Sequence, residues 1–96
     1  MSTPGLDYLL GTYFHQDFRV ENGGVWETVE AFIRDDPHYV EQLPGEIDEI
    51  LRTKATEEEV AAYVDSTGCE YWADPAAGGY RAWLVEMARR VASTTD

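Results

Sequence analysis

The sequence of 96 residues carries 19 acidic and 7 basic side chains, which give a formal net charge of −12. A chain of this length forms one domain, and a content of 44% hydrophobic and 12% aromatic residues is too apolar for a disordered polypeptide. Because phosphate binding needs an excess of lysine and arginine, the charge argues against direct binding to nucleic acid or to an anionic membrane. It favours a cationic partner.

The N-terminal third predicts two helices that are separated by an irregular segment. The first is expected over residues 4–14, where apolar side chains recur at helical spacing. Residues 15–24 show no clean period and end in a turn signal. The second helix is expected over residues 25–35, with Glu30 paired with Arg34 on its outer face.

The middle of the chain continues the helical spacing from Val40 to Leu51, with an interruption at Pro44-Gly45. Either one helix is kinked there, or a short helix stops at Leu43 and Pro44 opens a new one. We favour the second interpretation, with the new helix running to about residue 53.

Two more helices are predicted in the C-terminal half. Thr56 and the three glutamates after it form a capping box that opens one helix, and Gly68 is placed where a helix-ending glycine belongs. A loop over residues 69–79 leads to the last helix, expected over residues 80–92. The fold class is therefore all-α, a compact single-domain bundle of about five short helices.

Acidic residues concentrate in residues 21–50, which hold nine carboxylates and one basic residue, Arg34. Such charge either keeps helix faces solvated or forms a binding surface for a basic partner. Five of these carboxylates project away from the predicted apolar faces, and we expect them to merge into one negative, partner-binding surface: Glu27, Glu30, Glu41, Asp48 and Glu49.

Side chains for metal binding or catalysis are few. His15, Asp17 and His38 are candidate metal ligands, but no paired cysteine or His-Glu-x-x-His motif supports a site, so we expect no metal and no cofactor. Cys69 is the only cysteine, which excludes an intramolecular disulfide, and we expect it to be a small core residue. No phosphate loop or nucleophile motif is present, and the protein is not expected to be an enzyme.

The N-terminus has neither the basic nor the apolar region of a signal peptide, and no apolar run approaches the length of a membrane span. We therefore expect a cytoplasmic protein.

The segment Tyr-Phe-His-Gln-Asp-Phe after the first helix is unusual because it combines three aromatic and three polar side chains. We expect a folded-back turn that is anchored by Phe14 and Phe18, with His15 donating to free carbonyls at the helix end. The role of the segment is then structural, and it comprises Tyr13, Phe14, His15, Gln16, Asp17 and Phe18.

This segment, directly after the helix that contains Leu-Leu-Gly, resembles the opening motif of the small immunity proteins of contact-dependent growth inhibition systems. The similarity continues along nearly the whole chain, in Val29, Phe32 and Ile33, in residues 46–51, in residues 68–71 and in residues 80–84. Pro44-Gly45 departs from the pattern, because an uninterrupted helix is expected there.

The resemblance implies a protein that binds the C-terminal toxin domain delivered by a neighbouring cell, neutralises it and performs no catalysis. It identifies no binding residues. Many such toxins are nucleases with basic clefts, which an acidic inhibitor would suit.

The free protein is expected to be a monomer. The alternatives are a general acidic interaction module or nucleic-acid mimic and, more remotely, a small metal-binding protein or enzyme. If the interface is not acidic, the exposed aromatic residues are the next candidates: Tyr8, Trp26, Tyr71 and Trp72.

Overall fold

The computed structural model describes residues 3–15 and 17–94, and within these ranges it holds helices, turns and loops but no strand. The predicted all-α fold class is thus confirmed. The α-helices are α1 (Pro4–Tyr8), α2 (Phe18–Asn22), α3 (Val25–Asp35), α4 (Leu43–Thr53), α5 (Glu57–Ser66) and α6 (Gly79–Thr94).

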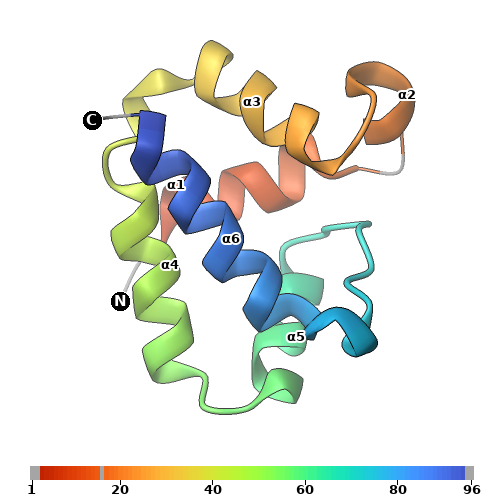
Figure 1. Cartoon of the computed structure of the whole chain (residues 1–96), viewed down its shortest axis with the longest axis vertical. Helices are drawn as coiled ribbons and strands as arrows, with labels where there is room; N and C mark the ends of the chain where they lie inside the picture. Colours follow the sequence, from red (N-terminus) through yellow and green to blue (C-terminus); the bar gives the residue numbers. More distant parts are fainter. Residues whose placement is uncertain (1–2, 16, 95–96) are drawn as a thin grey trace.

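Helix α6 is the element around which the others are arranged. It runs diagonally across the front of the molecule, with α4 on its left, α5 below it and α3 across the top (Figure 1). α6 packs against both α4 and α5, and α1 packs against α4. None of the helices in the described ranges is both long and apolar enough to span a bilayer.

The first predicted helix is present, but its second half is wound differently. After α1 the chain continues as a π-helical segment, Leu9–Tyr13. A β-carbon on Gly11, in the middle of this segment, would lie 2.5 Å from the Thr67 carbonyl oxygen. Only glycine fits at this approach to the end of α5, which explains the glycine of the Leu-Leu-Gly sequence.

Helix α2 was not predicted, because residues 15–24 show no helical period. It is little more than one turn long, and such a turn needs no repeating apolar face. The buried side chain of Phe18 holds it against the core, and the Asp17 carbonyl accepts the Glu21 N–H at 3.0 Å. Tertiary contact therefore stabilises a helix too short to form alone.

Pro44 lies in the first turn of α4, as the favoured interpretation of the interruption predicted. The short helix expected to stop at Leu43 was wrong. A 3₁₀ turn over Pro37–Tyr39 comes earlier instead, and a turn in which the Val40 carbonyl accepts the Leu43 N–H at 3.3 Å connects it to α4. Pro37 accounts for this position, because its fixed φ favours the start of a helical turn.

The predicted caps of α5 are confirmed. The Thr56 side chain accepts the Glu59 backbone N–H at 3.2 Å, and Gly68 follows the helix with a φ of 88°. A left-handed residue at this position is the usual end of a helix.

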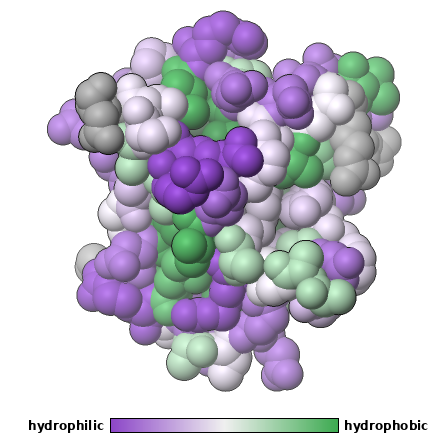
Figure 2. All heavy atoms as spheres, in the orientation of Figure 1, coloured by the Kyte–Doolittle hydropathy of each residue, from purple (hydrophilic) through white to green (hydrophobic). Residues whose placement is uncertain are grey.

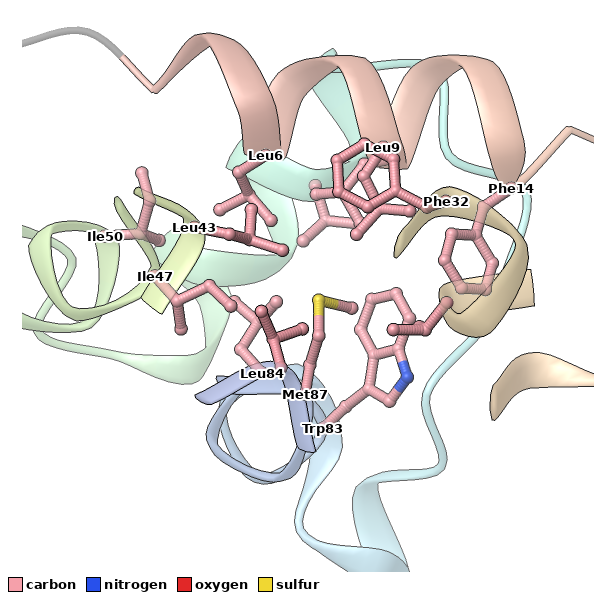
Figure 3. Packing of buried hydrophobic residues seen from close by; sticks show 14 of the residues in the cluster. Leu6, Leu9, Phe14, Phe32, Leu43, Ile47, Ile50, Trp83, Leu84 and Met87 are labelled. Atoms are coloured by element: carbon pink, nitrogen blue, oxygen red, sulfur yellow. The ribbon is translucent and has the colours of Figure 1, made fainter. Parts of the chain in front are cut away.

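One hydrophobic cluster joins all six helices, and its buried members include Leu10, Phe32, Ile47, Trp83 and Leu84. Figure 3 shows Phe32, Ile47, Trp83 and Leu84 in this cluster. Phe14 meets the Trp83 ring edge to face, with centroids 5.1 Å apart. The Trp83 indole nitrogen is buried without a hydrogen-bond partner among the described residues.

Candidate functional site

The five carboxylates of the predicted acidic surface lie on two separate parts of the fold. Glu27 and Glu30 are exposed on α3, and Glu41 is exposed in the turn before α4. Asp48 is exposed on α4, whereas Glu49 beside it is half-buried. Figure 1 shows α3 across the top of the molecule and α4 along its left side, running in different directions, whereas antiparallel neighbouring helices would place their outer carboxylates on one surface.

The charges of α4 are partly neutralised within the helix. Arg52 donates to Asp48 at 2.8 Å and to Glu49 at 3.0 Å. The pairing predicted between Glu30 and Arg34 was wrong, because Arg34 bonds the adjacent Asp35 at 3.0 Å. This contact lowers the pKa of Asp35 through a hydrogen bond from the guanidinium group.

The geometry therefore divides the predicted acidic surface into paired and unpaired carboxylates. Among the described residues, no ion pair is found for Glu27, Glu30 or Glu41. These three carry the part of the negative charge that is freely available to a partner.

Two further carboxylates serve inside the fold, and sequence analysis did not predict this. Glu46 is buried, where it accepts the Leu6 backbone N–H at 2.9 Å and the Gln42 amide at 2.6 Å. Glu57 accepts the Tyr80 backbone N–H at 2.6 Å, at the start of α6. Each satisfies an N–H group that has no partner in its own helix.

Glu46 could have been recognised from its position in the sequence. It lies at helical spacing from Leu43 and Ile50, on the apolar face of α4, where a carboxylate needs a partner. No comparable signal marks Glu57, which lies in the acidic first turn of α5.

The segment from Tyr13 to Phe18 is placed by its aromatic residues, as predicted. Phe14 is fully buried and Phe18 is nearly so, with ring centroids 5.1 Å apart. The Phe14 carbonyl accepts the Glu70 N–H at 2.7 Å, which connects this segment to the loop after α5. Gln16 lies outside the described residues.

The polar residues of this segment differ from the prediction. His15 does not donate to a helix carbonyl: its Nδ1 accepts the Asp17 backbone N–H at 3.1 Å, and its Nε2 lies 2.8 Å from a carboxylate oxygen of Glu21. The reason is that the chain turns back into α2, which brings Glu21 beside the imidazole ring. Asp17 is exposed.

The Tyr13 hydroxyl donates to the Asp36 carboxylate, which ties this segment to the end of α3. Burial, together with this hydrogen bond, raises the pKa of Tyr13 above the ordinary tyrosine range.

The candidate metal ligands are not brought together. His15, Asp17 and His38 are all described, and the described part of the chain contains no group of three such side chains that could hold an ion. Cys69 is half-buried against the core, and burial raises the pKa of its thiol to about 11. A thiol that stays protonated at neutral pH is a poor nucleophile.

Fold and surface together define a small helical protein with exposed, unpaired carboxylates. The chain belongs to the CdiI immunity protein family, whose family model matches residues 2–91. The predicted resemblance to immunity proteins of contact-dependent growth inhibition systems is thereby confirmed. No curated protein and no solved structure matches the chain. Membership implies a toxin-neutralising protein that acts as an inhibitor rather than an enzyme.

Proposed function

We propose that this protein acts in the cytoplasm as a monomer and binds the toxin domain encoded beside its own gene, covering a basic cleft of that domain. Family membership supports the role, and the net charge of −12 supports a cationic target, most plausibly a nuclease. The observation that carries the electrostatic part is that Glu27, Glu30 and Glu41 are exposed and form no ion pair with any residue that the structure describes.

Electrostatic fields of opposite sign on two proteins accelerate their association, whereas charge pairs at the centre of the interface slow dissociation of the complex. Glu27 and Glu30 are exposed residues that accelerate association, because they attract the toxin from a distance. Truncation of Asp48 or Glu49 costs about 2–5 kcal/mol of binding free energy if its toxin partner is left buried and unpaired.

The test measures association of the purified protein with the neighbouring toxin domain by stopped flow. Raising the salt concentration from low to about 0.5 M should slow association severalfold, because the Debye length falls to a few Å. Reversing the charges of Glu27, Glu30, Asp48 and Glu49 together should weaken the complex and abolish protection of cells that produce the toxin.

A matched control is available on α5. Glu58 and Asp65 are exposed and have no ion pair among the described residues, so their reversal changes the net charge as much as reversal of Glu27 and Glu30 does. Reversal on α3 should slow association more than reversal on α5. Equal effects, or association indifferent to salt, would contradict the proposed surface.

A further inference from the structure

Trp26, at the start of α3, separates two grooves along the line where α3 meets α6. The first groove has a volume of about 210 Å³, with Val29 and Ile33 among its apolar lining and Glu30 and Arg90 among its polar lining. The second groove has a volume of about 220 Å³, and it is lined in part by Tyr71. Trp26 lines both, so a ligand on this surface meets its ring from either side.

The Trp26 ring is held in place before any partner arrives. The ring is half-buried, and the Arg90 guanidinium carbon lies 4.2 Å from its centroid. Arg90 is itself fixed by Glu86 at 2.7 Å, and Arg89 bonds the same carboxylate. Because the ring is already ordered, little side-chain entropy is lost when a partner covers it.

Carboxylates outnumber guanidinium groups around Trp26. Figure 2 shows strongly hydrophilic residues over the upper, C-terminal half of α6, the half that carries Arg89 and Arg90. Glu86 balances part of their charge. Glu27 and Glu30 on α3 are exposed and form no ion pair within the described ranges, and the exposed Asp74 lines the second groove. The local field therefore favours a cationic partner.

We infer that Trp26 is the anchor of the toxin interface, and that the first groove receives an arginine or lysine side chain of the toxin domain. Such a side chain can lay its methylene groups along Trp26 and Ile33, which are only partly buried, while its charge meets the Glu30 carboxylate. Tryptophan is among the residues that most often dominate interface energetics when they are surrounded by contacts that exclude water. This inference rests on the proposed function and locates its centre on α3 and α6 rather than on α4.

Trp72 provides a matched control for Trp26. It is 67% exposed, in the loop before α6, and it lines neither groove. Trp26→Ala and Trp72→Ala each remove one indole side chain, so both variants lose the same hydrophobic group. A difference between their toxin affinities therefore depends on where the tryptophan lies in the fold.

The experiment measures the Kd for the neighbouring toxin domain by calorimetry, after circular dichroism has shown that each variant is folded. Trp26→Ala should raise Kd at least about 30-fold, equivalent to about 2 kcal/mol, whereas Trp72→Ala should change it less than about threefold. Glu30→Gln should raise Kd about tenfold and should not affect folding, because Glu30 is exposed and unpaired.

Amide hydrogen exchange of the wild-type complex keeps the test decisive if Trp26→Ala unfolds. Protection by the toxin should centre on α3 and the C-terminal half of α6. If the wild-type protein binds the toxin but is protected elsewhere, or if Trp72→Ala is the more damaging change, this inference is overturned and the proposed function stands. If the wild-type protein does not bind the toxin domain, both are wrong.

Discussion

Glu57 offers the sharpest test of how this fold is held together, because its carboxylate caps a helix other than its own. Its Oε2 accepts the Tyr80 N–H at 2.6 Å, and its Oε1 accepts the Arg81 N–H at 3.1 Å. Both donors lie in the first turn of α6, where they have no partner within the helix and where the helix dipole favours a negative charge. Arg81 in turn donates to the Leu51 and Lys54 carbonyls at the end of α4. One corner therefore joins α4, α5 and α6.

The magnitude follows from these contacts. Loss of a helix cap costs about 0.5–2 kcal/mol, and a hydrogen bond to a charged group contributes about 1.5–3 kcal/mol. Because Glu57 is only half-buried, we expect Glu57→Ala to lower the free energy of unfolding by about 2 kcal/mol. Glu57→Gln should lower it by about 1 kcal/mol, since one amide oxygen can replace only one of the two acceptors. For a domain of this size, about 2 kcal/mol lowers Tm by roughly 8–16 °C.

Glu58 is the control, because it is exposed in the same helical turn and has no hydrogen bond to α6. Glu58→Gln removes the same charge from the N-terminus of α5 with the same small change in helix propensity. Urea unfolding of the two glutamine variants isolates the contact with α6. The reasoning is refuted if Glu57→Gln and Glu58→Gln destabilise the protein equally.

Three further outcomes are expected. Trp83→Ala should cost about 3–5 kcal/mol in urea unfolding, because the residue is only 6% exposed. Trp83→Phe should cost less, since it also removes a buried indole N–H that has no partner among the residues the structure describes. Tyr13 and Tyr63 should ionise at higher pH than exposed tyrosines in an ultraviolet titration, because burial and a hydrogen bond to an aspartate raise the pKa of each. Since the folded-state pKa is the higher one, their stabilisation is complete below about pH 10 and is lost as the pH rises through the folded pKa, so Tyr63→Phe should weaken the alkaline loss of stability. His15→Ala and Asp17→Ala should lower Tm in thermal melts without abolishing toxin binding, and a stable Asp17→Ala protein that no longer binds would show instead that the segment takes part in recognition.

Helices with a long apolar period were predictable because the information is local. In α6, Trp83, Leu84, Met87 and Val91 recur at helical spacing, and all four are buried. The cap of α5 was predictable for the same reason, since Thr56 and Glu59 are only three residues apart. In both cases the residues that decide the conformation are neighbours along the chain.

The missed features depend on residues that are distant in the sequence. The spacing of Glu46 marks it as a carboxylate that needs a partner, but that partner, the Leu6 N–H, is known only from the structure. Glu57 is recognised as a structural residue only once Tyr80 is known to lie beside it. Helix α2 likewise forms because Phe18 reaches the core, and not because its own residues favour a helix. The five expected interface carboxylates were chosen from their projection on helices, which predicts that they face solvent but not that they share one surface. Four of them are exposed, and Glu49 is half-buried.

This distinction changes how the charge of the protein should be understood. A net charge of −12 describes the field far from the molecule, which governs solubility and the rate of encounter with a cation. The field near the surface depends on which carboxylates already have partners. Glu46 and Glu57 accept hydrogen bonds within the fold, and Arg52 bonds both Asp48 and Glu49. A basic partner that approaches α4 must therefore compete with Arg52, whereas one that approaches Glu27 and Glu30 on α3 meets carboxylates that have no ion pair among the described residues. At equal charge count, the exposed face of α3 offers the larger gain in electrostatic free energy on contact.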